Sequence, residues 1–157
     1  MNLILWRHAE AEDSEPDINR KLTSRGRKQA ARMAQWLTRH LPQKHQVICS
    51  PATRTRQTAD ALSDHYEVDD LLAPHCDVAD YIAACDWPSG SAQAGGTVVI
   101  VGHQPILGRF ASLLLSGAEH NWTIKKGAIW WLSTREREGN EQVILRASLT
   151  PELIDQP

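Results

Sequence analysis

The chain has 157 residues, a formal net charge of −2 and three cysteines. This length suits one domain over residues 1–157, and the charge argues against a nucleic-acid partner, because proteins that bind nucleic acid are usually basic. No apolar run approaches the roughly 20 residues that span a bilayer, so no membrane association is expected. The cysteines show no Cys-x-x-Cys spacing, which disfavours a disulfide framework or a cysteine zinc site and favours the reducing cytoplasm.

Short apolar strands alternate with amphipathic helices from the start of the chain. Leu3–Trp6 is too short an apolar run for a helix, and the start lacks the basic region of a secretion signal, so we expect a first strand. Thr23 is expected to cap a helix that ends at Leu41, because the apolar residues between them recur at helical spacing. Val47–Cys49 is the next expected strand.

The middle of the chain combines a second helix with less regular segments. Ser50-Pro51 predicts a helix start, with a capping residue followed by proline at the first helical position, and the helix is expected from Ala52 to about Asp64. Val78–Cys85 is a further helix candidate. The Ser, Gly and Ala content of Pro88 to Gly96 predicts a loop and the best candidate for disorder.

The last third predicts a buried strand, a helix and a hairpin. Thr97–Val101 is continuously β-branched, as in a strand buried on both faces, and Ile106–Leu115 is the helix after it. Ala128–Leu132 and Gln142–Leu149 are expected to pair antiparallel around a polar turn at Arg135–Glu141. The whole order predicts an α/β fold, a three-layer α/β/α sandwich whose mostly parallel sheet has an antiparallel edge.

Histidine or arginine follows each expected parallel strand, and no carboxylate is expected in the same place. Ligands of open α/β sheets bind outside the carboxyl ends of the strands. Two arginines and two histidines at one edge suit a phosphate dianion, because one guanidinium group can donate two parallel hydrogen bonds to phosphoryl oxygens. Arg54 also falls in the first turn of a helix, where backbone amides and the helix dipole favour an anion. The three segments are Arg7-His8, Ser50-Pro51-Ala52-Thr53-Arg54 and Gly102-His103-Gln104-Pro105.

A histidine in this cluster is a candidate nucleophile. Neutral imidazole is the attacking form, and nearby guanidinium charges lower a histidine pKa and so favour that form. His8 is the better candidate, because its place at a strand end beside Arg7 restricts its movement. His103 is then expected to hold and polarise the phosphoryl oxygens.

The sequence resembles the histidine phosphatase superfamily, which has the phosphoglycerate-mutase-like fold. Within it, the short chain and the start Arg-His-Ala-Glu-Ala resemble the small SixA-type phosphohistidine phosphatases, and Lys125-Lys126-Gly127-Ala128 fits the same branch. The resemblance rests on four segments in matching order: Leu5-Trp6-Arg7-His8-Ala9-Glu10-Ala11-Glu12, Leu22-Thr23-Ser24-Arg25-Gly26-Arg27-Lys28-Gln29-Ala30, Cys49-Ser50-Pro51-Ala52-Thr53-Arg54-Thr55-Arg56-Gln57-Thr58-Ala59 and Val101-Gly102-His103-Gln104-Pro105.

The resemblance implies roles for the matching residues. His8 would take the phosphoryl group, and Arg7, Arg54 and His103 would form the catalytic phosphate pocket, with Arg20 as a further substrate-binding residue. It implies no cofactor and no metal, since arginines supply the charge stabilisation and the other histidines lack metal-ligand spacing.

Two further positions follow from the same alignment of motifs. Gly26 falls in the first helical turn, where the missing side chain permits close backbone packing. Lys126 is interpreted as a surface lysine in preference to a substrate contact.

One departure from the family pattern bears on the substrate. Relatives that act on phosphoesters carry a glutamate general acid after the second helix, and the corresponding segment Asp70–Asp77 contains none. An alkoxide leaving group needs a proton in the transition state, whereas the imidazole of phosphohistidine needs much less help. The missing acid therefore favours phosphohistidine, with Asp77 or His75 left open as substitute donors.

The sequence interpretation is a phosphatase that dephosphorylates phosphohistidine on a phosphorelay or phosphotransfer protein, which fits signal transduction but leaves open a general housekeeping role. The short chain leaves little material for a lid over the pocket, which suits a protein substrate. Two alternatives stay open: a phosphatase of small phosphoesters or nucleotides, and a non-catalytic phosphate-binding module. The sequence leaves open the partner, the phosphohistidine isomer and the oligomeric state.

Overall fold

The strands form a mixed sheet in the order β3-β2-β4-β1-β5-β6. The computed structural model describes residues 1–90 and 94–154. The pairs β1–β4, β2–β4 and β2–β3 are parallel, whereas β5 runs antiparallel to β1 and to β6. The predicted mostly parallel sheet with an antiparallel edge is therefore confirmed. The strands are β1 (Asn2–Arg7), β2 (Gln46–Cys49), β3 (Glu67–Val68), β4 (Thr97–Gly102), β5 (Ile129–Arg137) and β6 (Asn140–Leu149).

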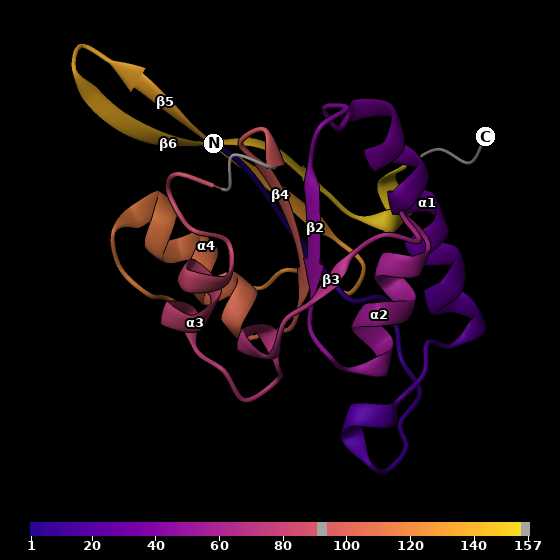
Figure 1. Cartoon of the computed structure of the whole chain (residues 1–157). Coiled ribbons are helices and arrows are strands. Elements are labelled where there is room, and N and C mark those ends of the chain that lie inside the picture. Colours follow the sequence, from indigo (N-terminus) through magenta and orange to yellow (C-terminus); the bar gives the residue numbers. More distant parts are fainter. Residues whose placement is uncertain (91–93, 155–157) are drawn as a thin grey trace.

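Helices cover both faces of this sheet, as the three-layer prediction requires (Figure 1). On one face lie α1 (Ser24–His40) and α2 (Thr53–Asp60), and on the other lie α3 (Val78–Ala84) and α4 (Ile106–Ser116). Short 3-10 turns complete the order: η1 (Asp17–Asn19), η2 (Asp70–Leu72) and η4 (Pro151–Leu153). None of the helices in the described ranges is long and apolar enough to cross a lipid bilayer.

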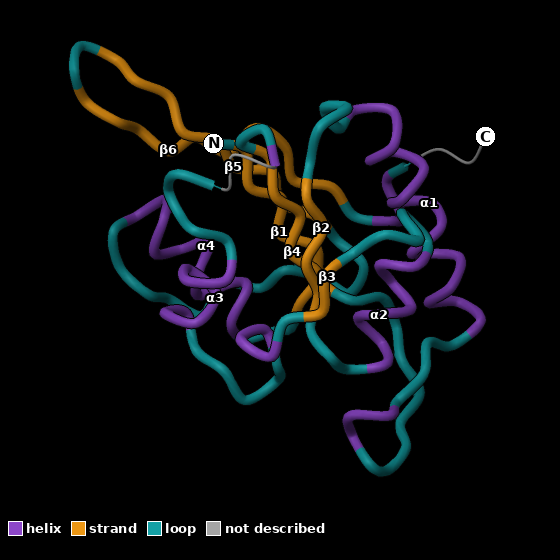
Figure 2. The backbone as a smooth tube through the Cα atoms, in the orientation of Figure 1, coloured by secondary structure: helices purple, strands orange, loops and turns teal. Residues whose placement is uncertain are grey.

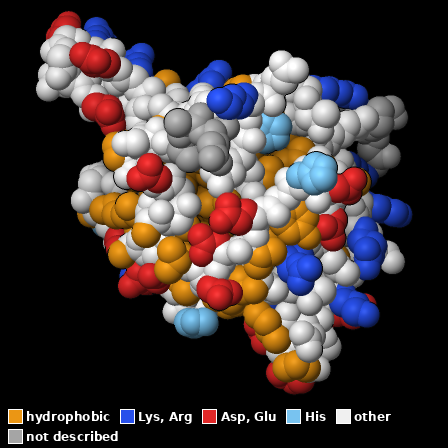
Figure 3. Space-filling model, viewed as in Figure 1, with side chains coloured by type: hydrophobic (Ala, Val, Ile, Leu, Met, Phe, Trp, Pro, Cys, Tyr) orange, Lys and Arg blue, Asp and Glu red, His pale blue; other side chains and the backbone are white. Residues whose placement is uncertain are grey.

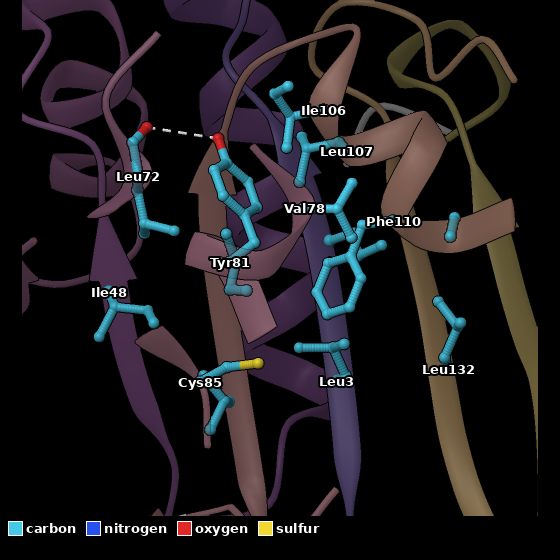
Figure 4. Packing of buried hydrophobic residues seen from close by; sticks show 14 of the residues in the cluster. Leu3, Ile48, Leu72, Val78, Tyr81, Cys85, Ile106, Leu107, Phe110 and Leu132 are labelled. Atoms are coloured by element: carbon cyan, nitrogen blue, oxygen red, sulfur yellow. Dashed lines mark hydrogen bonds between the residues drawn. The ribbon is translucent and has the colours of Figure 1, made fainter. Parts of the chain in front are cut away.

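Burial on both faces explains why the parallel strands are continuously apolar. Successive side chains of a strand point to opposite faces. Leu3 and Leu5 of β1 therefore pack with α3 and α4 in one core cluster, part of which Figure 4 shows. Ile4 and Trp6 pack with α1 in the second cluster. All four side chains are fully buried, so β1 is fixed from both sides at the point where the chain enters Arg7-His8.

The first helix follows its sequence pattern closely. The Thr23 hydroxyl accepts a hydrogen bond from the Gly26 amide, which confirms the predicted cap, and Leu41 closes the helix. Its apolar positions face the sheet and are buried. A Cβ atom added to Gly26 would lie 2.0 Å from the carbonyl oxygen of Glu10, which confirms the predicted close backbone packing.

Three local predictions were wrong. The second helix begins at Thr53 and ends at Asp60, and its N-cap is Ala52, so Ser50-Pro51 precedes the helix instead of capping it. The polar run expected as a turn at Arg135–Glu141 is mostly strand. The connection is only Glu138-Gly139, because both residues adopt positive φ, as a two-residue hairpin loop requires. The hairpin extends beyond the rest of the sheet in Figure 2.

One segment of the middle chain also differs from the sequence prediction. The two-residue strand β3, exposed along its length, was not predicted. The loop expected to be disordered at Pro88 to Gly96 includes residues 91–93, which lie outside the described residues.

We predict that Gly26→Ala destabilises the protein by about 2 kcal/mol or more, because the methyl group must displace the Glu10 backbone. Helix propensity alone favours alanine over glycine by roughly 1 kcal/mol, so the sign of the change is diagnostic. Urea unfolding measures the difference. Gln35→Ala, at an exposed position of the same helix, is the control, and a stabilised Gly26→Ala protein contradicts the packing argument.

Candidate active site

Three neighbouring strands bring the sequence-predicted residues together at one sheet edge. In the order β2-β4-β1, Arg7 pairs with Gly102 and Cys49 pairs with Val101, so the carboxyl ends of the strands are level (Figure 2). The amide of His8 donates to the Gly102 carbonyl at 3.1 Å, which continues the ladder one residue past the strand. The backbone of the site is thus an extension of the sheet.

His8 is held as a neutral imidazole with a defined tautomer. The side chain is 7% exposed, and Nδ1 lies 2.8 Å from the Ala9 carbonyl oxygen. Because a carbonyl only accepts, Nδ1 carries the proton and Nε2 keeps its lone pair. Burial lowers the pKa of His8 to about 3, although the hydrogen bond to Ala9 opposes this shift. The guanidinium charges of Arg54, Arg7 and Arg20 contribute to the same lowering.

His103 faces His8 across the site, with ring centroids 5.4 Å apart. Its Nε2 lies 2.7 Å from the Ser50 hydroxyl oxygen, and that oxygen accepts a hydrogen bond from the Ala52 amide. Ser50 is fully buried, and its hydroxyl proton has the His103 Nε2 as acceptor. This arrangement makes Nδ1 the protonated nitrogen of His103. Burial lowers the pKa of His103 to about 2, with the charges of neighbouring groups adding to the effect.

The two arginines are fixed by carbonyl oxygens. Arg7 donates from Nη1 to Ile124 at 2.9 Å, and Arg54 donates from Nη1 to Asp17 at 2.9 Å. Arg54 is 4% exposed and is the second residue of α2, where the helix dipole favours an anion. Three buried nitrogens have no partner among the described residues: Arg7 Nε, Arg54 Nε and His103 Nδ1. Buried donors are almost always paired, so this cluster is suited to an oxyanion.

A carboxylate from outside the three strand-end segments also lies at this edge, and the sequence did not predict it. Asp17, in the 3-10 turn η1, places its carboxylate 3.1 Å from Arg54 and 3.2 Å from Arg20. Burial raises the pKa of Asp17, but the hydrogen bond from Arg20 and the charge of Arg54 outweigh it and bring that pKa below its ordinary value. Asp17 is therefore an ionised group that shares its arginines with any bound anion.

Arg20 lies at the outer part of this network. Its Nε donates to the Glu12 carbonyl at 2.6 Å and its Nη1 donates to Asp17. Its charge acts on His8, so the structure brings it near the predicted pocket, but its described contacts are with the loop after β1.

Asp77 and His75, the two candidate proton donors from the sequence, lie outside the hydrogen-bond network of the site. Asp77 caps α3, where its carboxylate accepts from the Asp80 amide while Asp80 accepts from the Asp77 amide. His75 is exposed in the preceding loop. Neither side chain hydrogen-bonds to His8 or His103 in the described part of the chain.

Two participants in the site were missed by sequence reasoning. Ser50 was interpreted as a helix cap, although its position directly after a buried strand was a usable signal. Tyr81 had no such signal. Its buried hydroxyl donates to the Leu72 carbonyl, which Figure 4 shows, and accepts from the His103 amide at 3.3 Å. Tyr81 thus connects α3 to the second histidine.

Comparison with known proteins agrees with this geometry. The model of the Histidine phosphatase superfamily (branch 1) matches residues 3–74. An uncharacterized protein from Picosynechococcus is 32% identical over 139 residues, which is 82% of each chain. Among solved structures, a putative phosphohistidine phosphatase SixA from Nakamurella multipartitia is 30% identical, with a TM-score of 0.75 over 96% of this chain and 95% of that one.

A second solved structure shares the fold more closely. The protein histidine phosphatase SixA, complexed with tungstate, has a TM-score of 0.80 at 24% identity, over 99% of this chain and 100% of that chain. The chain belongs to the histidine phosphatase superfamily and, within it, to the SixA-type branch. Its family and fold support a phosphatase, and hence a hydrolase.

We predict that the two buried histidines make the protein sensitive to acid. In the unfolded chain a histidine binds a proton below its ordinary pKa of 6.5, whereas His8 and His103 stay neutral in the folded protein to about 3 and about 2. Stability is therefore complete above pH 6.5 and falls as the pH is lowered, by up to about 1.4 kcal/mol per pH unit for each histidine.

Urea unfolding at pH 7 and pH 5 in phosphate-free buffer measures this loss. The variant His103→Gln is expected to lose about 2 kcal/mol less than the wild type between these pH values. The exposed His65 gives the control variant His65→Gln, which should behave as the wild type. An equal loss in His103→Gln and wild type contradicts the prediction.

Proposed function

We propose that the protein hydrolyses phosphohistidine on a protein substrate, with His8 as the nucleophile. The observation that carries the proposal is the neutral His8, its Nδ1 proton bound to the Ala9 carbonyl, beside three unpartnered buried nitrogens. A lone pair on Nε2 attacks phosphorus, and donors from Arg7, Arg54 and His103 bind the phosphoryl oxygens.

The reaction has two steps. In the first, His8 Nε2 forms a bond to phosphorus, and the bond from phosphorus to the substrate imidazole breaks. The leaving nitrogen keeps the electron pair of the broken bond, and the other ring nitrogen of the substrate already carries a proton near neutral pH, so the side chain leaves as neutral imidazole. In the second step, a water molecule attacks the phosphorus of phospho-His8, inorganic phosphate leaves, and Nε2 regains its lone pair. The positive charges stabilise the transferring phosphoryl group in both steps.

The surroundings of the site favour a P–N over a P–O bond. The carboxylate that hydrogen-bonds to Arg54 is that of Asp17, which is ionised and therefore a poor proton donor. Asp77 is occupied at the start of α3. An alkoxide would leave without a proton, whereas an imidazole leaves readily. The names of the SixA neighbours support the same substrate class.

We expect His8→Ala to remove turnover while the fold is retained. Phosphate release is measured, with chelator present, from a histidine-phosphorylated carrier protein, a phosphoserine peptide and a small aryl phosphate. The wild type should release phosphate selectively from the carrier, and alkaline quenching should trap label on the wild type but not on His8→Ala. His65→Ala, at an exposed histidine, is the matched control.

Each other outcome identifies a different function. Equal or faster release from the esters, reduced by Asp77→Asn or His75→Ala, favours a phosphatase of small phosphoesters or nucleotides. Binding of the phosphorylated carrier without release favours a phosphate-binding module. Turnover by His8→Ala would falsify the role of His8.

Ser50 is expected to position His103 through its hydroxyl. Ser50→Ala removes the proton that fixes Nε2 as acceptor, so the phosphate-facing nitrogen is no longer held as a donor. We expect kcat on the carrier to fall about 10-fold or more with a smaller change in KM, in line with the loss of one oxyanion donor. Ser50→Thr, which keeps the hydroxyl, should recover part of the rate. Equal rates in both variants exclude the positioning role.

A further inference from the structure

Positive charge is concentrated on one helix of a chain whose net charge is negative. Helix α1 contains no Asp or Glu between Ser24 and His40. Figure 3 shows basic side chains gathered on the side of α1 and α2, and acidic ones toward the middle of the view and α3. The basic residues of α1 are Arg25, Arg27, Lys28, Arg32 and Arg39.

A second group of cations lies directly beside the active site. Lys125 and Lys126 are exposed, and they stand between two residues that contact the site. The carbonyl of Ile124 accepts from Arg7, and the amide of Gly127 donates to the carbonyl of His8 at 3.0 Å. These exposed lysines therefore lie within two residues of the backbone groups that contact Arg7 and His8.

The loop with these lysines packs against α1. A Cβ atom added to Gly127 would lie 3.4 Å from Cβ of Gln29, and the Gln29 amide oxygen accepts from the backbone of Glu10 at 3.0 Å. Gln29 lines the same small hollow as Arg25, Lys28 and Arg32. The two groups of cations thus form one continuous surface, the basic band, consisting of Lys125, Lys126, Arg25, Lys28 and Arg32.

The cations of the basic band are available to a partner. Lys28 and Arg32 line a hollow of about 710 Å³ on one side of α1 and one of about 150 Å³ on the other. Neither residue forms an ion pair with any residue in the described ranges, nor does Lys126. Two carboxylates do lie at the band: Glu10, 3.9 Å from Arg25, and Glu152, whose pKa is lowered by backbone and Thr150 hydrogen bonds and by cations of the band.

We propose that the basic band docks an acidic protein surface that surrounds the phosphohistidine. This inference rests on the proposed function. His8 is buried, so the substrate imidazole must enter the site while the partner's surface meets the residues around it. Carboxylates on that surface complement the band, which raises the rate of productive encounter. The acidic residues near α3 repel the same surface and so orient the partner toward α1.

The test reverses two charges of the band. Lys28→Glu with Arg32→Glu is compared with the wild type for kcat/KM on a histidine-phosphorylated carrier whose face around the phosphohistidine is rich in Asp and Glu. We expect a decrease of about 10-fold or more at low salt that shrinks as salt is added. The kcat/KM for the small aryl phosphate should be the same in the variant and the wild type. If the enzyme does not cleave this ester, phosphoramidate, a small compound with a P–N bond, replaces it.

Two controls make the result specific. Arg135→Glu with Arg137→Glu changes the charge equally on the exposed end of the β5–β6 hairpin and should leave kcat/KM unchanged. A carrier with its acidic face changed to Asn and Gln should not distinguish the band variant from the wild type.

The outcomes separate this proposal from the one on which it rests. If the wild type releases phosphate from the carrier and the band variant does so equally well, the docking surface is wrong and the proposed function stands. If the wild type releases none from the carrier, both are overturned. Stronger competition by RNA than by the unphosphorylated acidic carrier assigns the band to nucleic acid and also overturns the proposal.

Discussion

The hydrogen bond between His8 Nδ1 and the Ala9 carbonyl is the interaction on which the rest of the site depends. It sets the tautomer of a buried imidazole, and burial beside arginines keeps that imidazole neutral. The bond itself favours protonation, and the pKa of His8 is lowered because desolvation and positive charge outweigh this effect. A less buried histidine with the same hydrogen bond would be protonated through more of the acidic range and would lack its lone pair there.

Burying positive charge at this edge costs free energy, and the fold offsets that cost with carbonyl oxygens and one carboxylate. Arg7 and Arg54 each donate to a backbone carbonyl. Asp17 adds a negative charge that is half exposed and belongs to a short turn. The Asp17 carboxylate stabilises the Arg54 guanidinium in the free protein, and the Nε of Arg54 has no partner among the described residues. We infer that an incoming phosphoryl group shares the guanidinium with Asp17 and need not displace it.

The sequence identified much of this site because buried strands are easy to recognise and chemistry follows their ends. Arg7, His8, Arg54 and His103 were all predicted from their positions after apolar runs, and the structure brings them together. Asp17 was missed because it reaches Arg54 through a polar loop whose path depends on tertiary contacts, 37 residues away in sequence. Ser50 was assigned the wrong local role, since a serine before proline fits a helix start as well as a contact to a distant histidine.

The hairpin error has a different physical origin. Charged residues at the end of β5 suggested a turn, but strands need buried neighbours only where they cover the core. Beyond Thr134 the two strands pair with each other and stay exposed, and the tight turn is set by the positive φ values of two residues. The hydrophobic pattern predicts the part of a strand that packs against the core. The backbone conformation at the turn determines how far the hydrogen-bonded pairing of β5 and β6 continues.

Under the proposed function, two different parts of the protein select the substrate: the pocket selects the bond type, and the surrounding surface selects the partner. The proposed phosphate-binding groups would contact the phosphoryl oxygens of a phosphate monoester and of a phosphoramidate alike, so they would not discriminate between the two. Under the proposed function, discrimination comes from the leaving group, because among the described residues Asp17 is ionised and Asp77 caps a helix, and neither is placed to give an alkoxide its proton. Recognition of a protein then falls to the surface around the site, where the cations of α1 and of the loop before β5 are contiguous. We therefore infer that bond type is selected by what the pocket lacks as a proton donor, and the partner by charge outside it.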